Sequence, residues 1–275
     1  MLYALLKEVS TNPLLLKIIR FLKLNQIMKK IYFMLNTIPF REKKVNFMGI
    51  SAILQISNYD ELKTFEQFFR ENYGAEFLML KALLEFLNEG DVAYDVGANI
   101  GLYTILMAKE VGSIGKIIAF EPDSKNFEAL RRNLEVNSLN NVKPIKVALG
   151  DKVSEGSLYI KKRVGIGAVS LLQNEESDFR NTTKIFPGDF IVERKKIPLP
   201  KAIKIDVEGY EYLVLKGLKK TLSNNSCKLV CCEIHSNLTP AGITKENILN
   251  LIKSYGFNKI NTYKRGSEIH AICYK

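Results

Sequence analysis

The stretch Asp95-Val96-Gly97-Ala98-Asn99-Ile100-Gly101 decides the fold of this 275-residue chain. A mostly apolar run, residues 92–96, leads into it, and a helical pattern, residues 102–111, follows it, so that the stretch forms a turn from a buried strand into a helix. Gly97 lets the backbone pass close to a ligand, and Gly101 lets the helix begin tightly against the turn. In open α/β sheets, ligands bind beyond the carboxyl ends of the strands. The stretch therefore predicts an α/β fold with a ligand site at this turn.

The alternation of strand and helix continues along the chain. Further apolar runs, typical of strands buried on both faces, lie at residues 116–121, 142–148, 203–207 and 229–234. Helical patterns accompany them at residues 76–88, 124–137, 211–222 and 245–255, and Asp123 stands at the N-cap position of the second of these. Two last strands, at residues 257–263 and 269–274, predict an antiparallel hairpin. We therefore expect a Rossmann-like, doubly wound α/β fold with a seven-stranded sheet and a C-terminal antiparallel hairpin.

The chain is expected to divide into an N-terminal region and a main domain. Residues 1–75 predict a mainly helical accessory region with a short strand pair, because Asn12-Pro13 and the apolar positions after it are typical of the start of an amphipathic helix. Residues 76–275 are expected to form the main domain. Within it, residues 151–200 interrupt the strand–helix rhythm and are too long for a simple connection, so they predict a substrate-side insert.

A carboxylate twenty residues after the turn indicates a nucleoside cofactor. Glu121 ends the second strand, where it can accept hydrogen bonds from both hydroxyls of a ribose. The dinucleotide pattern G-x-G-x-x-G is incomplete, because Asn99 stands at its second glycine and the third glycine is missing. Asp95 is a poor neighbour for a pyrophosphate but a good one for a cationic amino-acid group, which favours S-adenosylmethionine. The alternative for Asp95 is a carboxylate that only caps the helix.

Four motifs resemble those of the FkbM family of class I S-adenosylmethionine-dependent methyltransferases, which are mostly O-methyltransferases. These motifs are Asp95-Val96-Gly97-Ala98-Asn99-Ile100-Gly101, Ala119-Phe120-Glu121-Pro122, Ala148-Leu149-Gly150-Asp151 and Ile203-Lys204-Ile205-Asp206-Val207-Glu208-Gly209. They follow the family's order and spacing between about residues 90 and 235, and the last is the most specific. The family's usual Thr-Leu-Asp before the fourth strand is absent, so the substrate region departs from the pattern.

The resemblance implies how the cofactor lies across the turn. Asp95, Gly97 and Gly101 would line its methionine end, and Glu121 would hold the ribose. Pro122 and Asp123 would flank the adenine, with Ala148 near it at the end of the third strand. Asn99, in the turn, and Asp206, at the end of the fourth strand, complete the expected cofactor-binding set. The implied reaction is methyl transfer to the hydroxyl of a sugar or small molecule.

The end of the fourth strand is the expected place for catalysis. Asp206 and Glu208 point the same way if Val207 is extended, which places two carboxylates at the entrance of the ligand site. A hydroxyl nucleophile must lose its proton, and a carboxylate or a histidine can accept it. Asp206 is the first candidate and His235, after the fifth strand, is the second; the alternative for His235 is a hydrogen-bonded structural histidine. His270 lies in the predicted hairpin, far from this edge, and is expected to be structural.

No metal ion is expected. Asp206, Glu233 and Asn237 offer the oxygen ligands that Mg²⁺ prefers, but nothing in their spacing demands an ion. Lys204 is expected to form a structural ion pair with Glu208 or Glu233. The four cysteines are expected to be small buried side chains in a reducing compartment.

The net charge of +11 lies mainly in the N-terminal region. Residues 1–50 hold nine basic and two acidic side chains, so they carry seven of the eleven excess charges. Residues 1–40 predict either a helix packed on the main domain or an interfacial helix on anionic lipid. No uncharged apolar run reaches the length of a membrane span. We therefore expect a cytoplasmic protein, which would be peripheral to the membrane if residues 1–40 form the interfacial helix. If the substrate is a glycan on a lipid carrier, a basic amphipathic segment at residues 1–40 would hold the enzyme at the membrane that contains it.

Three alternatives remain open from the sequence. An RNA substrate is allowed by basic side chains that flank the insert, but no aromatic residues interleave them for base stacking, so nucleic acid is not the expected partner. An NAD(P)-dependent oxidoreductase is disfavoured by the missing glycine and the closing hairpin. A cofactor-free interaction module is disfavoured because Asp95, Glu121 and Asp206 are all present.

Overall fold

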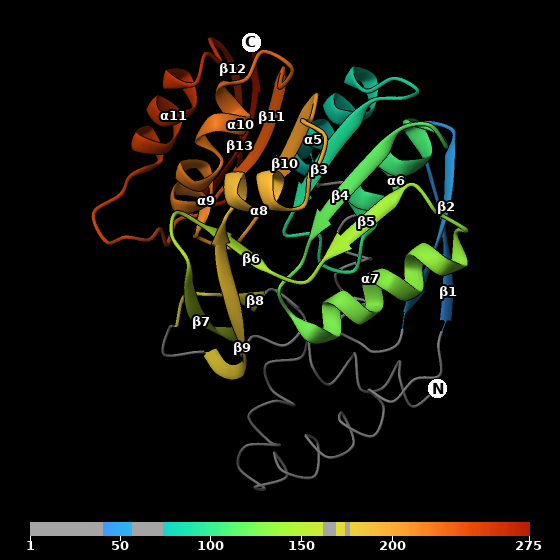
Figure 1. Cartoon of the computed structure of the whole chain (residues 1–275), viewed down its shortest axis with the longest axis horizontal. Helices are drawn as coiled ribbons and strands as arrows, with labels where there is room; N and C mark the ends of the chain where they lie inside the picture. Colours follow the sequence, from blue (N-terminus) through green and yellow to red (C-terminus); the bar gives the residue numbers. More distant parts are fainter. Residues whose placement is uncertain (1–40, 57–73, 162–168, 174–176) are drawn as a thin grey trace, which may run out of the picture.

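The computed structural model describes residues 41–56, 74–161, 169–173 and 177–275 (Figure 1). The predicted amphipathic helix after Asn12-Pro13 lies outside the described residues. Among the described residues, no helix combines the length and the apolar character that crossing a bilayer requires.

A mostly parallel sheet forms the centre of the molecule. In the described part of the chain it has seven strands in the order β12-β13-β11-β10-β3-β4-β5. Their bounds are β3 Val92–Val96, β4 Lys116–Phe120, β5 Val142–Ile145, β10 Ala202–Ile205, β11 Leu229–Ile234, β12 Lys259–Arg265 and β13 Glu268–Tyr274. Only β13 runs antiparallel to its neighbours, β11 and β12. The predicted Rossmann-like sheet with its C-terminal hairpin is confirmed.

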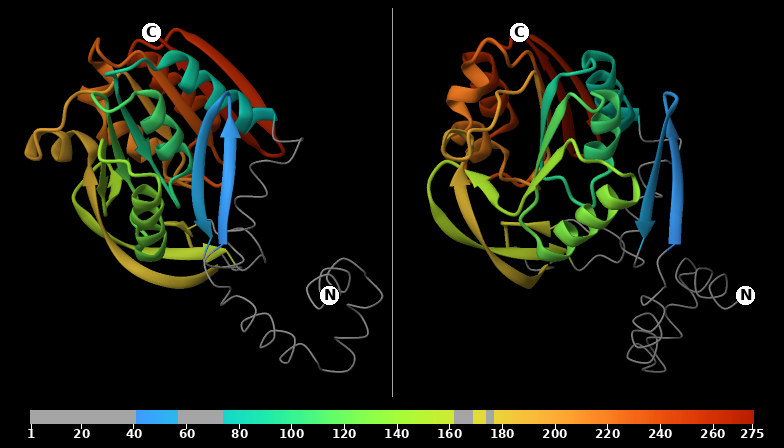
Figure 2. Two further views of the ribbon diagram at one scale, coloured as in Figure 1. Left: turned by 90° about the vertical axis from the view of Figure 1, so that its right-hand side faces the viewer. Right: turned by 45° about the vertical axis from the view of Figure 1, so that its right-hand side comes forward.

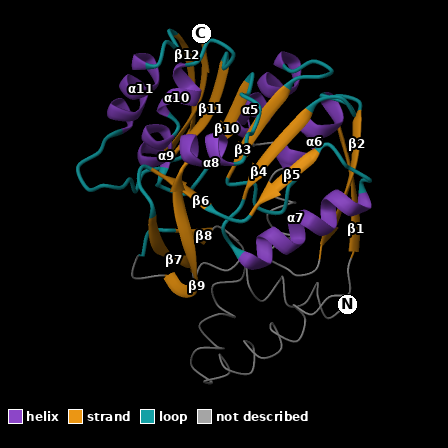
Figure 3. Ribbon diagram, in the orientation of Figure 1, coloured by secondary structure: helices purple, strands orange, loops and turns teal. Residues whose placement is uncertain are grey.

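Helices cover both faces of this sheet, as the doubly wound class requires (Figure 3). One layer consists of α5 Gly74–Phe86, α6 Leu102–Glu110 and α7 Ser124–Val136. The other consists of α8 Gly188–Arg194, α9 Glu211–Gly217, α10 Lys219–Ser223 and α11 Lys245–Ser254. Two separate hydrophobic clusters form the core, one under each layer. The chain turns from β3 towards β4 on one side and later enters β10 on the other side of β3, so the strand order reverses between β3 and β10.

The helix expected at residues 211–222 is interrupted at Leu218, which ends α9 and precedes α10. Asp189, in α8, accepts hydrogen bonds from the backbone N–H groups of Lys220 and Thr221 at 2.7 and 2.9 Å. These bonds satisfy the first amides of α10, so a side chain from another helix starts α10 separately. The sequence around Leu218 gives no sign of this distant partner.

The insert forms a second, four-stranded sheet in the order β6-β9-β7-β8. Its strands are β6 Ala148–Gly150, β7 Ser154–Lys161, β8 Val169–Ser170 and β9 Ser177–Pro187. The run at residues 142–148, expected as one strand, is divided between the two sheets, because Val147 N–H bonds to the Ile145 carbonyl at 3.1 Å in a tight turn. β9 and α8 were not predicted, since residues 177–194 lack a clear alternation.

A hairpin of β1 Arg41–Phe47 and β2 Ile50–Ile56 packs on the α6–α7 layer (Figure 2). The strand pair predicted there is confirmed. Asn137 Oδ1 accepts from Ile53 N–H at 2.9 Å and Asn137 Nδ2 donates to the Ile53 carbonyl at 2.6 Å, while Asn133 Oδ1 accepts from Gln55 N–H at 2.7 Å. Leu54 is fully buried in the same core cluster as this layer. Residues 41–56 therefore share a hydrophobic core with the main domain.

Candidate functional site

An open pocket lies where the strand order reverses. Seven of the predicted site residues line it: Gly97, Asn99, Glu121, Pro122, Ala148, Asp206 and Glu208. The small sheet and its flank add apolar side chains that the sequence did not single out, Leu158, Val169 and Leu171. The predicted ligand site at the carboxyl ends of β3, β4 and β10 thus coincides with a pocket.

The glycine turn is fixed by its closeness to β10. Gly97 has a φ of 82°, and a Cβ atom there would lie 1.8 Å from the carbonyl oxygen of Asp206. The Gly97 and Ala98 N–H groups both donate to the Phe120 carbonyl at 3.0 Å. Gly101 has a φ of 96°, and a Cβ there would meet Leu130 at 2.5 Å. Both glycines are therefore required by close approach as well as by backbone conformation.

Glu121 is held by the backbone on both sides of the pocket. Its Oε2 accepts from Asn99 N–H at 2.7 Å, and its Oε1 accepts from Asp123 N–H at 2.8 Å. Burial raises the pKa of Glu121 to about 7, although these two hydrogen bonds oppose the rise. The carboxylate is thereby fixed in one orientation, with its remaining lone pairs available to a ligand.

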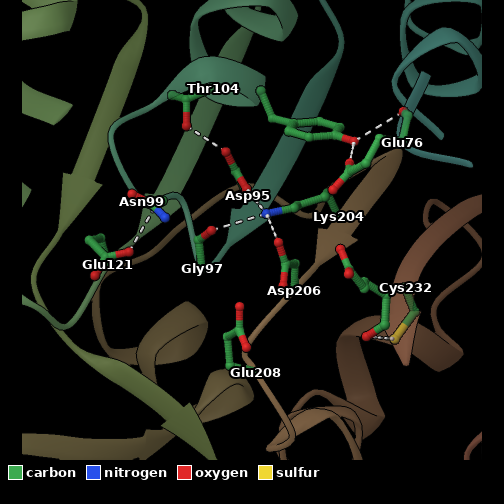
Figure 4. Close-up of polar contacts among 12 residues, drawn as sticks. Glu76, Asp95, Gly97, Asn99, Thr104, Glu121, Lys204, Asp206, Glu208 and Cys232 are labelled. Carbon is green, nitrogen blue, oxygen red and sulfur yellow. Dashed lines mark hydrogen bonds and ion pairs between the residues drawn. The ribbon is translucent and has the colours of Figure 1, made fainter. Parts of the chain in front are cut away.

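A buried lysine joins the glycine turn to the fourth strand. Lys204 Nζ donates to the Gly97 carbonyl at 3.0 Å and lies 3.4 Å from both Asp95 Oδ1 and Asp206 Oδ2 (Figure 4). Burial disfavours its charge, but the surrounding carboxylates outweigh this and raise the pKa of Lys204. Lys204 was expected to form a structural ion pair with Glu208 or Glu233; the structure pairs it with Asp206 and with Asp95, which stands in register with it on the neighbouring strand.

Asp95 itself lies beneath the turn and does not line the pocket. Its side chain is fully buried, and Oδ2 accepts from Thr104 Oγ1 at 2.6 Å. Through Thr104 it ties α6 to β3, and through Lys204 it reaches the carbonyl of Gly97. Its place in the structure is thus a support for the turn.

Asp123 also holds the walls of the pocket together. Its Oδ1 accepts from the N–H groups of Lys125 and Asn126, which caps α7, as the sequence predicted for residue 123. Arg180, from β9, binds the same carboxylate with two hydrogen bonds of 2.8 and 2.9 Å. The sequence did not identify Arg180, because nothing local marks a partner 57 residues away.

His235 stands behind the two catalytic carboxylate candidates. Its Nδ1 lies 2.7 Å from Glu211 Oε1, and its Nε2 lies 3.6 Å from Glu208 Oε2 and 4.0 Å from Asp206 Oδ1. Burial disfavours the charged imidazole, but the hydrogen bond to Glu211 and the nearby carboxylates prevail and raise the pKa of His235 to about 10. Asp206 and Glu208 lie next to each other (Figure 4) and line the pocket. His235 does not line it.

His270 belongs to the charged network around Glu233 and does not line the pocket. Its Nε2 is 3.2 Å from Glu233 Oε2, and its side chain is fully buried. Arg265 bonds to Glu233 at 2.7 Å and to Glu76 at 3.0 Å, so a residue of the hairpin bridges β11 and α5. Burial and the charge of Asp206 raise the pKa of Glu233. The strand pairing of Glu233 with His270 creates this network.

The described residues include two groups with the donors that metal ions use. They are Glu76 with Glu233 and His270, and Asp206 with Glu233 and His235. Both groups share Glu233.

Comparison with known proteins places residues 95–259 in a family model described as the methyltransferase FkbM domain. The hexuronic acid methyltransferase AglP of Haloferax volcanii is 31% identical over 61% of this chain and 65% of its own length. Methyltransferase 1 of Beauveria bassiana is 24% identical over 45% of this chain and 57% of its own length. The chain thus spans less than two thirds of each of these relatives. An rRNA methylase structure from Streptococcus thermophilus superposes with a TM-score of 0.45 and 11% identity, covering 72% of this chain and 95% of that one.

Proposed function

The chain belongs to the FkbM methyltransferase family, as its motifs predicted, and from this premise we propose that it transfers the methyl group of S-adenosylmethionine to a hydroxyl oxygen. The observation that carries the proposal is the pocket at the reversal of strand order, with Glu121 fixed at one side and Asp206 with Glu208 at the other. The cofactor needs a group that binds its nucleoside, which Glu121 offers at one side, and the reaction needs a proton acceptor near the methyl group, which the carboxylates offer at the other.

The cofactor would be held mainly by residues of the pocket wall. Glu121 would accept from the ribose hydroxyls, and Pro122 and Ala148 would flank the adenine. At Gly97 and Asn99, which line the pocket, the backbone of the turn would contact the methionine end of the cofactor. We assign Asp95, Gly101 and Asp123 to holding this wall in shape, because none of the three lines the pocket.

Methyl transfer would take place between this cofactor and a hydroxyl beside Asp206. When bound, S-adenosylmethionine would supply an electrophilic methyl group to the hydroxyl oxygen and would leave as a neutral thioether. The hydroxyl proton passes to a pocket carboxylate, for which Asp206 and Glu208 are placed. His235 acts through these carboxylates, since it faces them and does not line the pocket. Positioning is expected to provide most of the rate, because in-line displacement depends on alignment.

For the substrate, we propose a glycan that contains a hexuronic acid. The support is the similarity to a hexuronic acid methyltransferase, together with the apolar side of the pocket formed by the small sheet, which suits the face of a sugar ring. An RNA substrate and a nicotinamide cofactor are not proposed, because neither has support in the family match.

The cofactor is tested by calorimetric titration with S-adenosylhomocysteine and with NAD. We expect binding of S-adenosylhomocysteine by the wild type, much weaker binding by Glu121→Ala, and no binding of NAD. Binding of NAD alone would overturn the proposal in favour of an oxidoreductase, and binding of neither would favour an interaction module.

The acceptor atom is tested with radiolabelled S-adenosylmethionine and hexuronic acid oligosaccharides. Label that survives mild base marks a methyl ether on a hydroxyl, which we expect. Label released by mild base marks a methyl ester on the carboxylate and would contradict the choice of a hydroxyl. Asp206→Asn is expected to lower kcat by about 10²–10⁴-fold, the usual contribution of proton transfer.

We propose further that the enzyme works in the cytoplasm at a membrane surface and that its glycan is lipid-linked. The support is the charge of residues 1–50, which carry seven of the eleven excess positive charges. The test is binding of the full chain to anionic and to neutral vesicles. Replacing Lys17, Lys23, Lys29 and Lys30 by Gln should abolish a preference for anionic vesicles, and equal binding of the wild type to both would contradict the proposal.

A further inference from the structure

Four carboxylate oxygens surround the Nε2 atom of His235 at almost equal distances. They belong to Glu208 at 3.6 Å, Glu233 at 3.7 Å, and Asp206 and Glu268 at 4.0 Å. These distances are too long for hydrogen bonds. They match ligand atoms that face a common ion, because donors about 2.1 Å from an octahedral cation lie about 3 to 4 Å from one another.

The imidazole is held in the orientation that a metal ligand needs. Its Nδ1 lies 2.7 Å from Glu211 Oε1, and that oxygen also accepts from Gly209 N–H at 2.9 Å. Glu211 therefore fixes the ring and directs Nε2 towards the four carboxylates. His235 is only 5% exposed, and among the described residues no partner lies within hydrogen-bonding distance of Nε2. A carboxylate behind a histidine is the usual outer support of a metal-binding imidazole.

We propose that Asp206, Glu233 and His235 bind a divalent cation beside the pocket, with Glu208 and Glu268 within its reach. One nitrogen and several oxygen donors suit Mn²⁺ better than Mg²⁺, which prefers oxygen alone. Asp206 shares its two oxygens between two cations, since Oδ2 faces Lys204 and Oδ1 faces His235. The site thus adjoins the pocket through Asp206 and does not require Lys204 to move.

The charges around His235 leave room for such an ion. Five carboxylates face it: Asp206, Glu208, Glu211, Glu233 and Glu268. Besides His235 itself, three cationic side chains touch members of this set: Lys204 at Asp206, Arg265 at Glu233 and Glu268, and His270 at Glu233. The carboxylates outnumber these three cations, and a divalent ion would take the place of the proton on His235.

The second group of donors, Glu76 with Glu233 and His270, is a weaker candidate. Arg265 already bonds to both of its carboxylates, at 3.0 and 2.7 Å, and Tyr103 donates to Glu76 at 2.5 Å. Arg265 also bonds to Glu233 and Glu268 at the proposed site, so the two groups differ mainly in their place relative to the pocket. None of the members of the second group lines the pocket, whereas Asp206 of the proposed site does.

The role that the ion would have in catalysis rests on the proposed function. A divalent cation next to the substrate hydroxyl stabilises the oxyanion that forms as the proton leaves. Asp206 would then act as its ligand, and Glu208 would remain as the pocket carboxylate that accepts the proton. Binding of the ion, by contrast, can be measured without cofactor or substrate.

The test is a titration of the full chain with Mn²⁺, followed by the electron paramagnetic resonance signal of the free ion. The chain has two histidines, so histidine nitrogen coupling to bound Mn²⁺ in a pulsed experiment can come only from His235 or His270. We expect one Mn²⁺ per chain and a nitrogen coupling that His235→Gln removes and His270→Gln retains. Absence of binding, or a coupling that depends on His270, would overturn the inference.

Three further variants separate a ligand role from a loss of fold. Asp206→Asn, at a partly exposed side chain, should abolish Mn²⁺ binding without a change in the circular dichroism spectrum. Glu211→Gln should weaken binding by about 10- to 100-fold, as loss of an outer support does. Glu128→Gln, an exposed change on α7, should leave it unaltered. Unaltered binding in Asp206→Asn would also contradict the site.

The same samples are titrated with S-adenosylhomocysteine. Binding of S-adenosylhomocysteine without binding of Mn²⁺ would overturn this inference and leave the proposed function standing. Binding of Mn²⁺ without S-adenosylhomocysteine would support the metal site and count against the proposed function.

Discussion

The backbone N–H of Asn99 donates to Oε2 of Glu121 at 2.7 Å, so the turn after β3 is bonded directly to the residue that ends β4. Asn99 has a φ of 50°, in the left-handed region, at the tight turn between Gly97 and Gly101. The same carboxylate accepts from Asp123 N–H, at the start of α7. One side chain therefore sets the distance between the two ends of the proposed cofactor site.

Replacing Glu121 by Gln tests this arrangement at constant side-chain size. The variant loses a charged acceptor for the ribose, and hydrogen bonds to charged groups contribute about 1.5–3 kcal/mol. We expect S-adenosylhomocysteine to bind about 10- to 100-fold more weakly, measured by calorimetry. Glu128→Gln, the same change at an exposed position of α7, is the control and should bind as the wild type does. Equal affinity in both variants would exclude Glu121 as a ligand.

The pH dependence of stability should carry the signature of Glu121. Burial raises the pKa of Glu121 from 4.5 to about 7, so between these pH values the native state keeps a proton that the unfolded chain has lost. This contribution to the free energy of unfolding is complete below pH 4.5 and is lost as the pH rises through about 7, with an upper limit of about 3 kcal/mol. Urea unfolding of the wild type and Glu121→Gln between pH 5 and 8 measures it. Parallel curves for the two proteins would show that the pKa of Glu121 is ordinary.

Gly97→Ala should be strongly destabilising. The new Cβ would lie 1.8 Å from the backbone carbonyl of Asp206, and the φ of 82° is costly for alanine. We expect a loss of about 2–5 kcal/mol in the free energy of unfolding. The matched control is Gly90→Ala, with a φ of 87° and its nearest contact at 3.5 Å, which should lose only about 1–2 kcal/mol. A similar loss in both variants would show that the turn can move away from β10.

Arg180→Ala should loosen the small sheet from α7. It removes two hydrogen bonds from Asp123, a carboxylate with a side chain that is only 1% exposed. We expect a loss of about 1–3 kcal/mol in urea unfolding, with incomplete rescue by Arg180→Lys, since lysine cannot form the paired bonds. Arg131→Ala, which breaks an exposed 3.8 Å pair, should cost less than about 0.5 kcal/mol. An equal cost at both positions would contradict the structural role of Arg180.

Lys204→Met should leave Asp95 and Asp206 without the cation between them. Loss of one partner from a buried ion pair costs about 3–5 kcal/mol, because the remaining charge is uncompensated. The double variant Lys204→Met/Asp95→Asn should recover part of this loss, which thermal or urea unfolding measures as a coupling free energy. Additive losses would mean that Asp95 and Lys204 do not interact.

Much of the main domain could be predicted because its signals are local. The bounds of β3 and β11 agree with the apolar runs at residues 92–96 and 229–234, and Asp123 caps α7 as its sequence position indicated. Prediction failed at two kinds of segment. Residues 142–148 pass from one sheet to the other, and residues 177–194, which form β9 and α8, lack a periodic pattern. Burial against an element elsewhere in the chain decides such segments, and local sequence does not report it.

By itself, the sequence determined the α/β class, the glycine turn at Gly97 and the carboxylate at Glu121, because a strand, a tight turn and a helix cap each depend on a few neighbouring residues. Only the tertiary structure decided which charges meet. Arg265 reaches Glu76 across 189 residues, and Lys204 reaches Asp95 because β10 pairs in register with β3. The ring of carboxylates around His235 arises in the same way, from β10, α9, β11 and β13 together. Electrostatic interactions depend on distance in space, and the fold alone sets that distance.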